Sequence, residues 1–288
     1  MKLALGTVQF GLDYGIANTS GRIALEEAKS ILQLASESGM DTLDTAIAYG
    51  DSEAVLGQLG VQPWNVVSKL PGVPEDCGDV ALWVRQQVQG SLSRLGVSRL
   101  YGLLLHRPGQ LLEKTGPALY EALQSLKVDG VVCKTGISVY GPAELDALFD
   151  KHHFDLIQAP FNILDRGLVE SGWAARLQSA GMEVHTRSAF LQGLLLMSSE
   201  QRPSKFDRWQ SIWQEWARWL EDAGLTPLQA CLQYAVSQPN IDRVVVGVDT
   251  SAQLKEIIRA ADGKLTSLPS FAPLLDERLV NPAVWNQL

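Results

Sequence analysis

Four side chains able to carry acid–base chemistry follow three short apolar runs of the sequence. Asp44 and Tyr49 come after the first run, Lys69 ends the second, and His106 follows the third. A carboxylate beside an ammonium group stabilises both charges, and an ammonium beside a phenol lowers the pKa of the phenol because it favours the phenolate. An ordinary tyrosine, with a pKa of ~10, is a poor acid at neutral pH. The pattern therefore predicts that Lys69, paired with Asp44, makes Tyr49 a proton donor, while His106 orients a substrate oxygen by a hydrogen bond.

Each of these residues also has an ordinary structural explanation. An aspartate after a strand is commonly a cap or turn residue, a lysine a solvated end or half of an ion pair, and a histidine a packing residue. The arrangement of the strands decides between the two explanations. If the strands are parallel neighbours, all four side chains share one rim, which favours chemistry over coincidence.

Eight short apolar runs alternate with longer amphipathic stretches, which predicts strands buried on both faces and covered by helices. The expected strands are residues 3–9, 42–46, 65–70, 100–106, 131–138, 156–161, 183–188 and 243–248. The expected helices are residues 26–38, 80–95, 117–126, 142–149, 169–180, 227–237 and 252–260. This alternation predicts an α/β fold, a (β/α)8 TIM barrel formed as one domain by residues 1–288. An open doubly wound sheet is the competitor, but its G-x-G-x-x-G turn is absent from the sequence.

One further element breaks the alternation between the seventh strand and its following helix. Residues 205–223 carry Trp209, Trp213, Trp216 and Trp219, whose spacing places them on one helical stripe. We expect an extra helix packed over the barrel, with a lid or a subunit contact as the alternative. The segment after Leu265 is expected to be irregular and able to cover the barrel mouth.

Composition narrows the class of protein. The formal charge of −8, from 24 basic and 32 acidic residues, disfavours nucleic acid as a partner. The sequence has no apolar run long enough for a membrane helix and no signal-peptide pattern at its start. Three scattered cysteines, without a C-x-x-C pair, indicate neither a disulfide framework nor a metal site. A cytoplasmic protein is the simplest interpretation.

The motifs resemble those of a known family, the aldo-keto reductases. Asp44-Thr45-Ala46-x-x-Tyr49-Gly50, then Ser68-Lys69, then Leu104-Leu105-His106 are similar to that family's catalytic segments in order and spacing. The resemblance implies an NAD(P)H-dependent oxidoreductase in which Tyr49 is general acid in reduction and general base in oxidation. It also implies that Lys69 and Asp44 tune Tyr49, that His106 orients the carbonyl, and that no metal is required because the nicotinamide C4 carries the hydride.

Further segments resemble the family's cofactor-binding positions. The resemblance begins at Gly6 and Thr7 in the first strand. It assigns the carboxamide to Ser138 and Gln158, ring stacking to Phe161, and the pyrophosphate to the loop 187–193, where Gly193 would let the backbone approach closely. The cofactor residues expected on this basis are Gly6, Thr7, Ser138, Gln158, Phe161, Ser188, Phe190, Gln192, Gly193, Gly247, Asp249 and Gln253.

The last βα unit leaves the choice of cofactor open. The family commonly has a basic residue at the position of Asp249, where it meets the adenosine 2′-phosphate, and an asparagine at Ile257. A carboxylate repels a 2′-phosphate but can accept a hydrogen bond from a free 2′-hydroxyl. Lys255 or Arg259 could compensate. The habit of the family favours NADP(H) slightly over NAD(H).

The sequence says less about the substrate than about the reaction. Phe10, Tyr14 and the tryptophan helix could line a wall, and Asp13 or the pair Asp165-Arg166 could recognise hydroxyls, which suggests a sugar-like carbonyl substrate. A cofactor-binding regulatory protein with little turnover is the main alternative. A glycosidase ranks low because only Asp44 is an obvious rim carboxylate. A homo-oligomer is compatible with the sequence.

Overall fold

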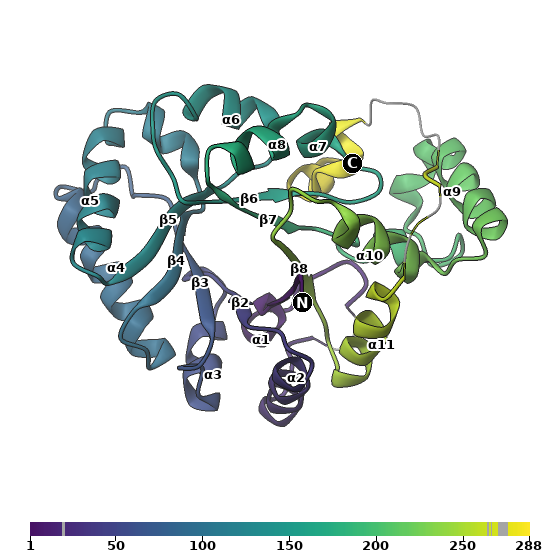
Figure 1. The fold of residues 1–288 in the computed structure, drawn as a ribbon, viewed down its shortest axis with the longest axis horizontal. Helices are drawn as coiled ribbons and strands as arrows, with labels where there is room; N and C mark the ends of the chain where they lie inside the picture. Colours follow the sequence, from purple (N-terminus) through teal and green to yellow (C-terminus); the bar gives the residue numbers. More distant parts are fainter. Residues whose placement is uncertain (19–20, 264, 266, 270–275) are drawn as a thin grey trace.

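Eight parallel strands close into a barrel in chain order (Figure 1). The computed structural model describes residues 1–18, 21–263, 265, 267–269 and 276–288. The strands are β1 (Leu3–Gly6), β2 (Thr42–Asp44), β3 (Asn65–Leu70), β4 (Leu100–Leu105), β5 (Val132–Ser138), β6 (Leu156–Pro160), β7 (Glu183–Arg187) and β8 (Arg243–Gly247). The predicted (β/α)8 barrel is therefore confirmed.

Closure of the barrel is set by the pairing of its first strand. Leu5 of β1 is in register with Leu43 of β2 on one side and with Val246 of β8 on the other. A small cluster of Val67, Leu104 and Leu156 packs separately from the larger core that the strands form with the helices. Strands with both faces buried need apolar residues at successive positions, which explains the continuous apolar runs of the sequence.

Helices cover the outside of the barrel, and several of the connecting loops contain short helices (Figure 1). The first half of the chain contributes α1 (Val8–Gly11), α2 (Leu25–Glu37), α3 (Ser52–Leu59), α4 (Val80–Leu95), η1 (Pro108–Leu112), α5 (Gly116–Val128) and α6 (Pro142–Leu148). The second half contributes α7 (Gly167–Glu170), α8 (Trp173–Ser179), η2 (Leu194–Leu196), η3 (Ser204–Trp209), α9 (Gln210–Ala223), α10 (Pro227–Ser237), α11 (Ser251–Ala261), α12 (Glu277–Val280) and η4 (Pro282–Gln287).

Two local expectations near the first strands were wrong. The strand expected over residues 3–9 ends at Gly6, and Val8–Gly11 forms the short helix α1, in which the Leu12 N–H donates to the Val8 carbonyl. The helix α3 was not expected. An eight-residue helix with only a short apolar face gives little periodic signal.

The extra tryptophan-rich element lies where the sequence predicts it, between β7 and α10. It begins as η3 and continues as α9, at the edge of the molecule in Figure 1. Trp213 and Trp216 are buried and donate through their indole N–H groups to the carbonyls of Phe206 and Leu195. These contacts support the interpretation of a packing helix. The irregular segment expected after Leu265 falls partly on residues 266 and 270–275, which lie outside the described residues.

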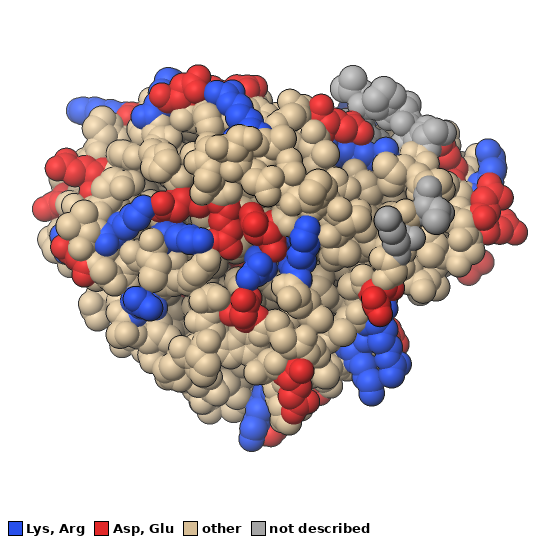
Figure 2. All heavy atoms as spheres, viewed as in Figure 1, with Lys and Arg blue, Asp and Glu red and all other residues tan. Residues whose placement is uncertain are grey.

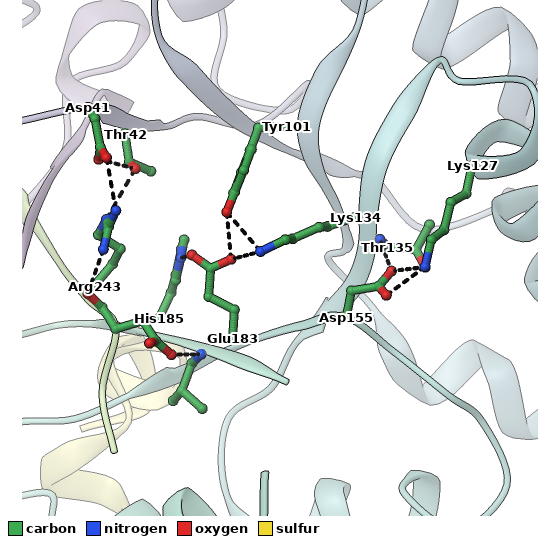
Figure 3. Close-up of polar contacts among 12 residues, drawn as sticks. Asp41, Thr42, Tyr101, Lys127, Lys134, Thr135, Asp155, Glu183, His185 and Arg243 are labelled. Carbon is green, nitrogen blue, oxygen red and sulfur yellow. Dashed lines mark hydrogen bonds and ion pairs between the residues drawn. The ribbon is translucent and has the colours of Figure 1, made fainter. Parts of the chain in front are cut away.

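Polar side chains tie the strands together near their amino ends (Figure 3). Tyr101 of β4, Lys134 of β5 and His185 of β7 all bind the carboxylate of Glu183, with oxygen–oxygen and nitrogen–oxygen distances of 2.8 Å from Tyr101 and 2.9 Å from His185. Burial alone would raise the pKa of Glu183, but hydrogen bonds from these partners outweigh it and hold the pKa at about 2. Glu183 therefore links three strands through its charged form.

The surface around this region mixes both signs of charge. Figure 2 shows acidic and basic side chains interspersed on the face in view, without a broad basic area. Across the described parts of the chain, every helix is too short or too polar to cross a membrane. Cys77, Cys133 and Cys231 are free.

Glu183→Gln should weaken the fold in a pH-dependent way. Since folding lowers the pKa of Glu183 from its ordinary 4.5 to about 2, its charge stabilises the native state above pH 4.5, and this contribution is lost as the pH falls towards 2. We expect a loss of about 2 kcal/mol near pH 7 that shrinks on acidification. Urea unfolding measures both, with the exposed Glu121→Gln as control. A pH-independent loss, or none beyond that of the control, would contradict the role of the charge.

Candidate active site

A cavity of about 670 Å³ opens at the carboxyl ends of the strands. Its wall includes all four residues expected to be catalytic and every expected cofactor residue except Phe161. Helix α11 and the residues Pro282 and Ala283 near the C-terminus complete it. The barrel thus gathers at one rim side chains that are far apart in the sequence, as parallel strands require.

A buried ion pair forms the floor of this cavity. The ammonium nitrogen of Lys69 lies 2.7 Å from Oδ2 of Asp44, and the two side chains are 1% and 7% exposed. The ammonium also donates to the carbonyl oxygen of Thr45 at 2.9 Å. Burial, the largest effect, disfavours the ammonium form, but the charge and hydrogen bond of Asp44 together with Tyr49 outweigh it, so the pKa of Lys69 is raised. Lys69 therefore stays positively charged although it is fully enclosed.

Tyr49 lies beside this pair, and His106 lies beside Tyr49. The Lys69 nitrogen is 5.1 Å from the centroid of the Tyr49 ring, and the Tyr49 and His106 rings meet edge to face with centroids 5.9 Å apart. Burial and then the positive charges of Lys69 and Arg187 lower the pKa of His106 to about 4. Near neutral pH the imidazole is thus uncharged and has one N–H to donate.

Close backbone packing fixes the position of Tyr49. A Cβ atom on Gly11 would lie 1.9 Å from the carbonyl oxygen of Tyr49, and one on Gly50 would lie 2.6 Å from the carbonyl oxygen of Gly11. Only glycine permits this approach of α1 to the loop after β2. The hydroxyl of Ser52 adds a buried anchor, because it donates to the carbonyl of Thr7 at 2.8 Å.

A second buried carboxylate, which the sequence did not single out, supports the same loop from α3. Glu53 accepts hydrogen bonds from Ser68 and Ser91 at Oε1 and from the guanidinium of Arg94 at Oε2. Ser68 directly precedes Lys69, so this network couples the Tyr49 loop to the strand that carries the lysine. The missed helix α3 hid the signal, because Glu53 is buried only once that helix is placed.

Gln158 makes a contact that the sequence did not predict. Its amide nitrogen donates to Oδ1 of Asp44 at 2.6 Å, and its oxygen lies 3.4 Å from the hydroxyl of Ser138. Asp44 therefore has a partner on each oxygen. Gln158 and Ser138 both line the cavity, where they remain candidates for binding a cofactor amide.

The loop after β7 adopts an unusual backbone. Ser188, Leu191 and Gln192 have φ angles of 63°, 49° and 53°, which side chains with a Cβ rarely adopt. Such strain concentrates at binding sites held by their surroundings. Gly193 has a φ of 90°, and a Cβ there would lie 2.5 Å from the Cβ of Ala17. The turn and the packing against Ala17 both require glycine here, and Gly193 also lines the cavity, where its predicted contact with the pyrophosphate stays a prediction.

Several expected wall residues lie elsewhere. Phe161 is fully buried and stacks on Tyr234 with ring centroids 5.1 Å apart, so the structure gives no support to its predicted stacking on a nicotinamide ring. Phe10 is also fully buried, and Arg166 donates to the backbone carbonyls of Ile163 and Pro269. These positions, like the tryptophan helix, are absent from the cavity wall. Tyr14 does line it, as expected.

Arg187 lines the cavity, although the sequence did not single it out as a functional residue. It ends β7, lies 4.9 Å from the centroid of the Tyr140 ring, and donates to the carbonyl of Val139. The sequence placed it in the expected strand 183–188 and in the loop 187–193, without a role of its own. Its position at the end of a strand, where polar groups face the barrel mouth, is the signal that could have identified it.

Comparison with known proteins identifies relatives over nearly the whole chain. The model of the aldo/keto reductase family matches residues 2–268. The uncharacterized oxidoreductase YqkF of Bacillus subtilis is 26% identical over 286 residues, covering 91% of this chain and 92% of its own. A probable voltage-gated potassium channel subunit beta of Arabidopsis thaliana is 23% identical, covering 96% and 92%.

Solved structures share the architecture. A putative aldo-keto reductase from Pseudomonas aeruginosa is 25% identical with a TM-score of 0.67, and the alignment covers 90% of this chain and 89% of that one. The holo form of an aldo-keto reductase from Bacillus halodurans has a TM-score of 0.72 at 22% identity, covering 92% and 88%. At this identity the second likeness concerns the fold alone.

Asp44→Asn should destabilise the protein strongly, because it leaves the buried ammonium of Lys69 without a counter-ion. We expect a loss of about 3 kcal/mol or more in the free energy of unfolding. Adding Lys69→Met should restore at least half of that loss, since the double variant buries no charge. Urea unfolding of the two variants tests this, with Asp51→Asn in the exposed pair with Arg22 as control. A cost for Asp44→Asn no larger than that of the control would contradict it.

Proposed function

Because the chain belongs to the aldo/keto reductase family, we propose that Tyr49 donates the proton when a small carbonyl substrate is reduced. Family membership makes the protein an oxidoreductase that depends on a nicotinamide cofactor. One observation carries the proposal for Tyr49. The Tyr49 ring lies beside the buried ammonium of Lys69, which is paired with Asp44. Tyr49 and Lys69 both line a cavity large enough for a small substrate and a cofactor.

The cavity wall fits a nicotinamide cofactor. The cavity is large, it extends across the ends of several strands, and the strained loop after β7 forms part of its wall. These features suit a long ligand. Two buried wall atoms, Oε1 of Gln9 and Oδ1 of Asp249, have no hydrogen-bond partner among the described residues. Ser138 and Gln158 would hold the carboxamide, Ser188 to Gly193 the pyrophosphate, and the β8–α11 unit the adenosine. When bound, the reduced nicotinamide supplies the hydride to the carbonyl carbon, whose oxygen then requires a proton.

The protein's own groups provide that proton. The Tyr49 hydroxyl gives its hydrogen to the carbonyl oxygen, and the negative charge left on the phenol oxygen is stabilised by Lys69. Asp44 keeps Lys69 charged and, through Gln158, is itself held in place. In the opposite direction the same phenolate would accept the proton of an alcohol.

His106 provides orientation rather than the proton. With a pKa of about 4 the ring is neutral near pH 7 and can donate a hydrogen bond to the substrate oxygen. An imidazolium there would repel Lys69, which is one physical cause of the lowered pKa.

The three free cysteines suit the reducing cytoplasm in which we propose that the enzyme works.

A cofactor-binding regulatory role is the second candidate. The relative named as a potassium channel subunit beta favours it, since that name describes an assembly component rather than an enzyme. The complete set of Asp44, Tyr49, Lys69 and His106 in one wall favours catalysis. Stoichiometric cofactor binding without turnover on a broad carbonyl panel would support the regulatory role instead.

Tyr49→Phe should abolish turnover while cofactor binding survives, because the change removes only a hydroxyl. We expect kcat to fall by about a thousandfold or more, with the dissociation constant of the cofactor within about threefold of the wild-type value. Steady-state kinetics and fluorescence titration measure the two, and Tyr120→Phe, outside the cavity, is the matched control. Wild-type turnover in the Tyr49 variant would remove Tyr49 from the mechanism.

We further propose a hydroxylated, sugar-like carbonyl substrate. Tyr14, Tyr140, Arg187 and Gln192 bring polar groups to the cavity wall beside Tyr49. Hydroxyl groups of a substrate could use the hydrogen-bonding capacity that these groups have beyond their contacts within the chain, whereas an apolar aldehyde could not. A panel of hydroxyaldehydes and alkyl or aryl aldehydes of matched size should show higher kcat/KM for the hydroxylated members. Activity confined to hydrophobic aldehydes would overturn this assignment.

A further inference from the structure

The part of the cavity wall formed by the last βα unit is acidic. Asp249 and Glu256 both line it, together with the uncharged Gly247 and Gln253. Among the described lining residues the cations are Lys69 and Arg187, which lie with Tyr49, His106 and Tyr140. Lys255 and Arg259, which might have supplied a positive charge here, do not line the cavity.

The carboxylate of Asp249 is poorly satisfied within the chain. Its Oδ1 is buried without a hydrogen-bond partner, and the described residues offer it no ion pair. Burial raises the pKa of Asp249, its hydrogen bond with Gln253 opposes the rise, and the nearby charge of Asp13 adds to it. A partner that donates a hydrogen bond would therefore stabilise this residue, and an added anion would destabilise it further.

The start of helix α11 is already occupied by acceptors of the chain itself. A helix N-terminus usually offers free N–H groups to a phosphate. Here the N–H of Ser251 donates to Oε1 of Glu27 at 2.5 Å, and the N–H of Gln253 donates to the hydroxyl of Thr250 at 3.1 Å. The N–H of Asp249, just before the helix, donates to the side chain of Gln253 at 2.7 Å. The carboxylate of Glu27, which does not line the cavity, thus already accepts the first N–H of the helix.

We propose that this wall selects NAD(H) over NADP(H), with Asp249 accepting a hydrogen bond from the adenosine 2′-hydroxyl. The inference rests on the proposed function, because it requires the adenosine to lie against the β8–α11 unit. A 2′-phosphate carries about −1.5 to −2 charges at neutral pH and would face the carboxylates of Asp249 and Glu256 and few free donors. A 2′-hydroxyl is neutral and would supply the donor that Oδ1 of Asp249 lacks. This proposal runs against the slight preference for NADP(H) that the family resemblance suggested.

Separate titrations of NADH and NADPH test the selection without any need for turnover. Quenching of the protein's eight tryptophans reports binding. The wild type should bind NADH at least about tenfold more tightly than NADPH, and the difference should shrink at high salt, which screens the repulsion. Asp249→Asn should narrow the difference by about tenfold, chiefly through tighter NADPH binding.

Asp262→Asn is the matched control, because it removes the same charge at the opposite end of α11 and away from the cavity. It should leave the preference unchanged. Equal or tighter binding of NADPH by the wild type would overturn the inference, and so would equal effects of the Asp249 and Asp262 variants. If either result is found while turnover still depends on Tyr49, the proposed function is unaffected. Failure to bind either cofactor would overturn the proposed function itself.

Discussion

The ammonium group of Lys69 is enclosed by the barrel wall, and a charge taken out of water in this way is costly unless a partner of opposite sign is close. Asp44 meets that condition at 2.7 Å. The pair constrains the rest of the site in two ways. It requires the ends of β2 and β3 to remain adjacent and in register, and it leaves a fixed positive charge beside the Tyr49 ring, where negative charge would develop in the proposed proton transfer.

The remaining architecture serves to hold that arrangement. Gly11 and Gly50 allow α1 to pack directly on the loop that carries Tyr49, and buried hydrogen bonds from Ser52 and to Glu53 fix the start of α3 behind it. At the opposite end of the strands, Glu183 ties β4, β5 and β7 together. Rigid elements of this kind are what keep catalytic groups within the narrow geometry that proton transfer needs.

The sequence predicted the barrel and the grouping of Asp44, Tyr49, Lys69 and His106, because strand order and apolar runs determine which strand ends meet. It could not predict contacts that depend on side-chain direction. Phe161 directly follows β6 but is buried against Tyr234, and the amide of Gln158 turns to Asp44. Single-residue spacing gives no information on either choice.

Transfer of hydride in a single turnover tests the role of Lys69 most directly. When enzyme with bound reduced cofactor is mixed rapidly with substrate, Lys69→Met should slow the chemical step by about a hundredfold or more, because the phenol oxygen of Tyr49 loses its stabilising charge. The Asp44→Asn/Lys69→Met double variant, which buries neither charge, should be slowed to a similar extent. Cofactor affinity should change by less than about threefold. A chemical step as fast as in the wild type in both variants would contradict the account.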